Sequence, residues 1–201
     1  MKKEEIKRFF KDFYQGKNTN TELKIDFDFD AAKAFEELSK EFKKTFSAVA
    51  KVEVEDKVFL VSDPYLNLNP DLKTFTKIAS NAVFAAKNLL SEAPKLAVLS
   101  AVELVNLNME SALYGAIIEA MGKRGQLGKD VFAEGPLSMD VALSEKAAKE
   151  KKVLTDVAGK ANVLLCHRTG IAKGIIEGLQ FIGKGKITKF ITDGSNIFKA
   201  V

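Results

Sequence analysis

The first forty-five residues repeat apolar positions at helical spacing, and many of those positions are phenylalanine. Two stretches, IKRFFKDFY and AKAFEELSKEFKKTF, each predict an amphipathic helix, and LKIDFDF between them alternates as a half-buried strand does. The aromatic stripe from Phe9 to Tyr14 suits a membrane or partner surface, but such a stripe more often packs on the protein's own core or on a dimer mate. We expect the stripe to pack in this second way.

Beyond residue 46 the pattern changes to short apolar runs that alternate with longer helical stretches. AVAKVEVEDKVFLVSD predicts a β-hairpin, and the next helix is expected to have Asn69 as its N-cap, Pro70 in first position and Asp71 in its first turn. Strands that alternate with helices are joined by right-handed crossovers. The pattern therefore predicts a three-layer α/β/α domain with a mainly parallel sheet over residues 46–201, preceded by a short segment of residues 1–45. The later strands are expected in KLAVLSA, DVFAEG, NVLLC and KITKFI, and the later helices in ESALYGAIIEAM, SEKAAKEKK and IAKGIIEGLQFI.

Polar loops are expected to gather at one edge of that sheet, because each follows a predicted strand and leads into a helix. In open α/β sheets, ligands bind beyond the carboxyl ends of the strands. The pair Gly135-Pro136 lies in one of these loops, EGPLSMD, and we interpret it as a strand-to-helix turn just before Asp140. The loops at this edge are residues 62–70, 100–108, 134–140 and 167–174.

Composition argues against several classes of protein. The chain has 201 residues, of which 46% are hydrophobic, and this is enough to bury a full core. Its 31 basic and 27 acidic residues are interspersed and give a net charge of +4, so nucleic acid is not expected as a partner. The chain has no long apolar stretch, so neither a membrane span nor export is expected. One cysteine, Cys166, allows no internal disulfide and favours the reduced cytoplasm.

The familiar catalytic groupings find little support. Cys166 and His167 are neighbours whose side chains point to opposite faces of a strand, so we interpret Cys166 as a buried inert thiol and His167 as a rim residue. His167 is the only histidine, which excludes a histidine-rich metal centre. GKRGQLGK at 122–129 follows a helix rather than a strand and is interpreted as a helix stop and turn. Gly174 and Gly178, four residues apart, predict close helix packing.

Several motifs follow one another from about Phe46 to about Gly183. They are LVSDPYLNLNPDL, KLAVLSAVELVN, RGQ at 124–126, EGPLSMDVALS and VAGKANVLL. In this order they resemble the phosphate acyltransferase family of phosphotransacetylases and phosphotransbutyrylases, whose pattern has a TD...N..P segment, a strand ending in S.VE, a GPL..D turn and a VAGDADILL strand. The resemblance implies an isocitrate/isopropylmalate dehydrogenase-like fold with one domain much reduced, and a cleft between domains. It also implies transfer of an acyl group between coenzyme A and inorganic phosphate, with no metal and no covalent cofactor.

The chain also departs from this family pattern. The family's amino-terminal domain is replaced by the short segment at the start of the chain. The family's SRADS or SRGDS segment, which supplies an arginine and an acid, corresponds to ITDGSNIFKAV, which keeps Asp193 and Ser195 but has no arginine. The family's PD.EAGN motif has become HRTGIAKG, where Arg168, Gly170 and Lys173 replace two acids and an asparagine. Without that arginine, we expect no phosphate-dependent turnover of acetyl-CoA or butyryl-CoA above background.

Candidate substrate-binding residues come from the loops at the sheet edge and from the motifs. Arg168 and Lys173 flank a helix entrance that could bind an anion, and a solvated basic loop is the alternative. The acidic and polar candidates also suit helix caps, a role compatible with ligand contact. No catalytic residue and no metal ligand is assigned. The set is Asp63, Asn67, Ser100, Glu103, Gly135, Asp140, Arg168 and Lys173.

Two functional hypotheses stay open on the sequence. The first is a compact phosphate acyltransferase that binds acyl-CoA, phosphate or acyl phosphate, with reduced or lost activity. The second is a non-catalytic paralogue that serves as a ligand-binding or oligomerisation module. Either protein is expected to be a cytoplasmic homodimer, because the family's second domain commonly carries the subunit contact. Phosphate-dependent release of thiol from acyl-CoA distinguishes the two hypotheses.

Overall fold

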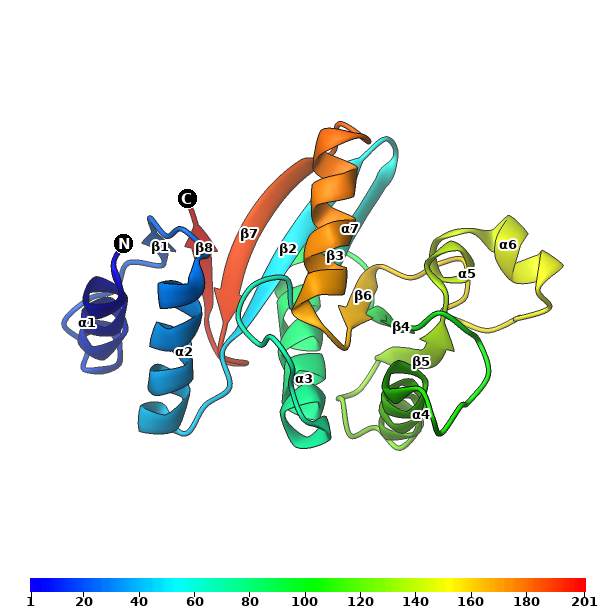
Figure 1. Ribbon diagram of the computed structural model, residues 1–201, viewed down its shortest axis with the longest axis horizontal. Coiled ribbons are helices and arrows are strands. Elements are labelled where there is room, and N and C mark those ends of the chain that lie inside the picture. Colours follow the sequence, from blue (N-terminus) through cyan, green and yellow to red (C-terminus); the bar gives the residue numbers. More distant parts are fainter.

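One eight-stranded sheet organises the computed structural model, which describes residues 1–201 (Figure 1). The strand order is β1-β8-β7-β2-β3-β6-β4-β5. The strands are β1 (Glu22–Leu23), β2 (Ser47–Val54), β3 (Lys57–Ser62), β4 (Lys95–Leu99), β5 (Phe132–Leu137), β6 (Val163–Cys166), β7 (Lys186–Thr192) and β8 (Ile197–Ala200). The helices are α1 (Lys3–Tyr14), α2 (Phe29–Phe42), α3 (Leu72–Leu89), α4 (Glu110–Lys123), α5 (Met139–Leu143), α6 (Glu145–Glu150) and α7 (Thr169–Phe181).

The sheet has a parallel part and an antiparallel part. Strands β3, β6, β4 and β5 run parallel, and the connections between them along the chain are helical: α3 between β3 and β4, α4 between β4 and β5, and α5 with α6 between β5 and β6. Strand β2 pairs antiparallel with β3 in the predicted hairpin and with β7, and β7 pairs antiparallel with β8. The carboxyl ends of the four parallel strands therefore lie at one edge of the sheet.

Helices cover both faces of the sheet, as the three-layer prediction requires. Successive residues of β3 show why, since Phe59 and Val61 enter the core beneath α5, α6 and α7, whereas Leu60 enters the core beneath α3 and α4. The buried strands are nearly continuous apolar runs, as expected for parallel strands covered on both sides. The α/β fold class predicted from the sequence is confirmed. No helix combines the length and apolar character needed to span a membrane.

The aromatic residues of α1 pack inside the protein. Phe10 is fully buried, and its ring centroid lies 5.2 Å from that of Phe35, 5.2 Å from that of Phe46 and 4.8 Å from that of Phe198. These edge-to-face contacts join α1 and α2 to the end of the sheet formed by β8. Both chain termini lie at this end of the molecule (Figure 1). The expectation that the stripe packs on the protein's own core is confirmed.

Two element boundaries differ from the prediction. Strand β1 contains only Glu22 and Leu23, because it pairs with only two residues of β8; residues 24–28 of LKIDFDF are irregular, and Phe29 begins α2. Helix α3 begins at Leu72, and its N-cap is Asp71, whose carboxylate accepts from Thr74 N at 2.7 Å, rather than Asn69. Short polar residues that precede a helix are all good caps, so the pattern located the start only to within two residues.

Two further expectations are corrected. Gly135, Pro136 and Leu137 are the last residues of β5; Gly135 and Pro136 fall in a register shift and Leu137 pairs with Leu99 of β4, so the turn that precedes α5 is confined to Ser138. Gly174 and Gly178 do not serve close helix packing, because a Cβ placed on either would meet no atom within 4 Å.

Candidate functional site

The candidate loops lie at the carboxyl edge of the parallel strands. Ser62 pairs with Leu165, and Leu99 pairs with both Cys166 and Leu137, so the loops after β3, β4, β5 and β6 start side by side. This confirms the expectation that the polar loops share one edge. The edge nevertheless holds two separate polar clusters.

The first cluster is built on the loop between β3 and α3. Asp63 is almost fully buried and accepts hydrogen bonds from Tyr65 N and Leu66 N, both at 3.0 Å, and from Asn67 Nδ2 at 2.5 Å. Burial outweighs these donors and raises the pKa of Asp63 above its usual range. Asn67 Nδ2 also donates to Phe46 O at 2.8 Å. Asp63 and Asn67 therefore shape this loop, and neither caps a helix.

Arg168 joins the same cluster from the end of β6. Its guanidinium donates to Asn69 Oδ1 at 2.5 Å and pairs with Glu110 Oε2 at 2.5 Å. The hydroxyl of the next residue, Thr169, donates to Asn67 O at 2.7 Å. Arg168 thus connects three loops at the sheet edge, and its charge is already matched by a carboxylate that the sequence analysis did not consider.

Three residues near Arg168 in the sequence, His167, Cys166 and Lys173, have little potential for catalysis. Burial lowers the pKa of His167 below its usual range, and the charge of Arg168 lowers it further. Cys166 is buried, as predicted, and burial raises the pKa of its thiol to about 12, which disfavours the reactive thiolate. Lys173 pairs at 3.7 Å with Glu177, one turn further along α7.

The second cluster joins the loops after β4 and β5 to the end of α6. Ser138 Oγ lies within hydrogen-bonding distance of Glu103 Oε1 and Asp140 Oδ1, and its one proton is donated to either carboxylate. Lys151 Nζ lies 2.9 Å from Glu103 Oε1, 3.0 Å from Ser138 Oγ and 3.2 Å from Asp140 Oδ2. Hydrogen bonds from Ser138, then from Lys151, hold the pKa of both carboxylates below their usual range. Such a charge-matched cluster holds the loops together, and its lysine stays protonated and cannot serve as a base.

Two further candidates have packing roles. Ser100 Oγ lies 2.9 Å from Ser111 Oγ and so links the end of β4 to α4. Gly135 lies under α4, where a Cβ would come within 2.8 Å of Val98 Cβ and 2.9 Å of Gly115 Cα. The close approach of α4 to β5 therefore explains why glycine is needed at this position.

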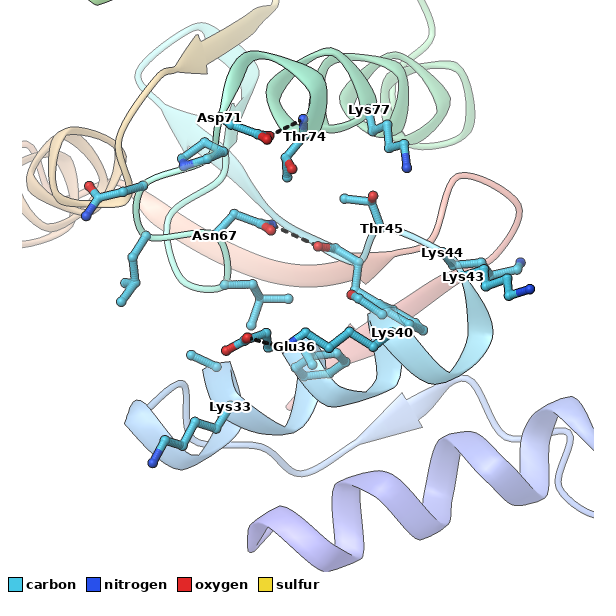
Figure 2. A pocket seen from close by; sticks show the side chains of 18 of the residues that line it. Lys33, Glu36, Lys40, Lys43, Lys44, Thr45, Asn67, Asp71, Thr74 and Lys77 are labelled. Carbon is cyan, nitrogen blue, oxygen red and sulfur yellow. Dashed lines mark hydrogen bonds and ion pairs between the residues drawn. The ribbon is translucent and has the colours of Figure 1, made fainter.

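A groove of about 780 Å³ opens beside the first cluster. Helix α2 forms one wall, and the loop after β3 together with the first turns of α3 forms the other (Figure 2). Asn67 bridges these walls through its bond to Phe46 O. Five lysines line the groove with only two acids, Glu36 and Asp71; the lysines are Lys33, Lys40, Lys43, Lys44 and Lys77. Sequence reasoning missed this groove, because nothing in the spacing brings α2 beside α3.

Comparison with known proteins identifies the family. Residues 32–166 match the family model described as phosphate acetyl/butaryl transferase. The chain belongs to the phosphate acyltransferase family. It is 42% identical over 124 residues to the phosphate butyryltransferase of Clostridium acetobutylicum, covering 61% of this chain and 41% of that protein. It is 33% identical over 153 residues to the phosphate acetyltransferase of Thermotoga maritima, covering 75% of this chain and 52% of that protein.

The fold of this phosphate acyltransferase family member is also found in solved relatives. A branched-chain phosphotransacylase from Enterococcus faecalis V583 superposes with a TM-score of 0.79 at 26% identity, covering 97% of this chain and 71% of that chain. The chain spans about half the length of the curated relatives it matches.

In the segment ITDGSNIFKAV, which lacks the family's arginine, the retained acid Asp193 has a structural role. The Asp193 side chain is fully buried, pairs with Lys44 Nζ at 2.6 Å and accepts a hydrogen bond from Tyr14 OH. Asp193 Oδ1 also accepts from Ser195 N at 2.8 Å and Asn196 N at 2.7 Å. Burial would raise the pKa of Asp193, but Lys44, Tyr14 and the amides together hold it below its usual range. This acid therefore ties α1 to the β7–β8 turn.

Proposed function

We propose that this chain binds an acyl-CoA and inorganic phosphate at the carboxyl edge of its sheet, and that it transfers the acyl group between them slowly. The observation that carries the proposal is the lysine-lined groove, which opens on the loop holding Asn67 and Asn69 in a member of the phosphate acyltransferase family. Its volume, about 780 Å³, lies in the range of small-molecule sites.

The reaction needs cations more than it needs a base. A phosphate oxygen attacks the thioester carbonyl carbon, a C–O bond forms and the C–S bond breaks, and CoA leaves as a thiolate that takes up a proton. Phosphate and the oxyanion bring several negative charges together, and positioned donors are needed to stabilise them. Arg168 is the arginine that faces this edge of the sheet, and it carries the bidentate guanidinium suited to phosphate.

Slow transfer follows from the contacts that these groups already make. Arg168 must leave Glu110 before it can bind phosphate, and Asp193 is buried beneath Tyr14 and Lys44. The exposed Arg168–Glu110 pair costs up to about 1 kcal/mol to break, about fivefold in rate. The larger loss comes from the arginine that the ITDGSNIFKAV segment lacks, since loss of one stabilising donor costs about a hundredfold to a thousandfold in rate. If Arg168 never leaves Glu110, the protein binds its ligands without turnover, which is the second hypothesis.

Turnover measurements test the proposal. Thiol release from acetyl-CoA and butyryl-CoA is followed with and without inorganic phosphate, for the wild type and for Arg168→Ala. We expect little phosphate-dependent release in the wild type and none in the variant. Fast release in the wild type that survives Arg168→Ala would contradict the role of Arg168. We further propose that the protein is a cytoplasmic homodimer, as expected from its family.

A further inference from the structure

The two ends of the groove differ in charge. Lys33 and Asp71 lie at one end, and Lys43, Lys44 and Lys77 lie at the other, where α2 ends beside the second turn of α3 (Figure 2). We call the end marked by Lys43 and Lys77 the lysine end. Lys33 and Lys43 are ten residues apart along α2 and its C-cap, so the two ends are separated by about 15 Å along the helix axis.

Two lysines at the lysine end have no ion-pair partner. Lys44 is matched by Asp193 at 2.6 Å and Lys40 by Glu36 at 2.7 Å, but neither Lys43 nor Lys77 forms an ion pair. Lys43 ends α2 and gains from the helix dipole there. Lys77 lies in the amino-terminal half of α3, where the dipole does not favour a cation, and the N-cap Asp71 is the acid whose charge acts on it.

The lining of the groove also includes apolar residues. Phe35, Phe46 and Leu66 are buried, and Ala32 and the exposed Leu68 lie with them along the groove. A ligand that fits this groove is elongated, with a multiply charged anionic end and a remainder that is less charged. Among the substrates of the proposed function, coenzyme A has this distribution, since its nucleotide carries a diphosphate and a 3′-phosphate.

We infer that the lysine end binds the phosphates of the nucleotide part of coenzyme A, with Lys43 and Lys77 as the contacting cations. The arm of the coenzyme then follows α2 toward Asn69, the groove residue that accepts a hydrogen bond from Arg168. The inference rests on the proposed function, because it assigns the orientation of the same substrate.

Binding measurements with fragments of the coenzyme test this orientation. Calorimetric titrations compare CoA, dephospho-CoA, adenosine 3′,5′-bisphosphate and pantetheine, for the wild type and for Lys43→Gln with Lys77→Gln. Each lysine removed is expected to weaken adenosine 3′,5′-bisphosphate binding about fivefold, and added salt should weaken wild-type binding in the same direction. Pantetheine binding should not change.

The matched control is Lys146→Gln with Lys149→Gln, which removes the same two charges from the exposed surface of α6. Lys33→Gln removes one charge at the other end of the groove and tests the orientation. Both should keep the wild-type preference for CoA over dephospho-CoA, whereas the Lys43 and Lys77 variant should lose most of it. Thermal melting of each variant shows whether it is folded, and the salt dependence of the wild type needs no variant at all.

The inference and the proposed function can fail separately. Wild-type affinities that the lysine-end substitutions do not change, or that the Lys33 substitution lowers as much, would overturn the inferred orientation even if acyl transfer is observed. Lysine-dependent binding of adenosine 3′,5′-bisphosphate by a protein without any acyl transfer would support the orientation and count against the proposed function.

Discussion

Replacing Gly135 with alanine should destabilise the protein through a collision between backbone segments. The new Cβ would lie 2.8 Å from Val98 Cβ and 2.9 Å from Gly115 Cα, and a Cβ added at Gly115 would likewise come within 2.9 Å of Pro136 N. Backbone and Cβ atoms cannot move aside as the end of a long side chain can. The variant can fold only if α4 moves away from β5 or the strand shifts in its register.

The expected magnitude combines two opposing effects. Overpacking of this kind costs about 1–3 kcal/mol. Loss of glycine's freedom in the unfolded chain offsets this by about 0.4–1 kcal/mol. The net loss is then about 1–2 kcal/mol, which lowers the melting temperature of a domain of this size by about 2–8 °C.

Gly174→Ala is the matched control, since it adds the same methyl group. Gly174 is an exposed residue inside α7 with no atom within 4 Å of the added Cβ, and alanine there should stabilise the helix by about 0.5–1 kcal/mol. Urea unfolding followed by circular dichroism measures both variants. If Gly135→Ala unfolds at the same urea concentration as Gly174→Ala, or at a higher one, the packing explanation of Gly135 is wrong.

Two predictions concern the contacts of Asp193. Tyr14→Phe removes a hydrogen bond to the buried carboxylate of Asp193 and should lower the free energy of unfolding in urea by about 1.5–3 kcal/mol. The control Phe13→Tyr, at a half-buried neighbouring position, should leave this hydrogen bond intact. Equal stability of Tyr14→Phe and the wild type would refute the anchoring role of Asp193. The folded-state pKa of Asp193 lies below its unfolded value of about 4, so its stabilisation is present above that pH and is lost as the pH falls through the folded pKa. As the pH falls below about 4, Asp193→Asn should therefore lose less stability than the wild type. Subtracting the variant's curve of stability against pH from that of the wild type isolates the contribution of Asp193 from that of Asp63, whose raised pKa has the opposite effect. Parallel pH–stability curves would contradict this assignment.

The meeting of polar loops at one edge could be predicted, because it follows from strand direction alone. Once the alternation of strands and helices indicates parallel strands, the residues after β3, β4, β5 and β6 must start at the same edge. Burial of Cys166 and of the aromatic face of α1 could be predicted for a similar reason, since apolar periodicity reports which side faces the core.

The partners at that edge could not be predicted, because they depend on tertiary packing. No spacing links Lys151 to Glu103 or Arg168 to Glu110, and these pairs form only when α6 and α4 are placed against the sheet. The role of Gly135 was hidden for the same reason, since its neighbour is another glycine on α4.

In the proposed function, the ion pair with Glu110 holds Arg168 away from phosphate. The direct measurement is phosphate-dependent thiol release from acetyl-CoA by Glu110→Gln, compared with the wild type and with Glu92→Gln. The control removes the same charge from an exposed ion pair with Lys95, at the amino end of β4.

An exposed ion pair contributes up to about 1 kcal/mol, so releasing Arg168 should lower the Michaelis constant for phosphate by up to about fivefold. We expect release near background in the wild type and in Glu92→Gln, and release measurably above background in Glu110→Gln. Fast release by the wild type that Glu110→Gln leaves unchanged or abolishes would contradict the claim.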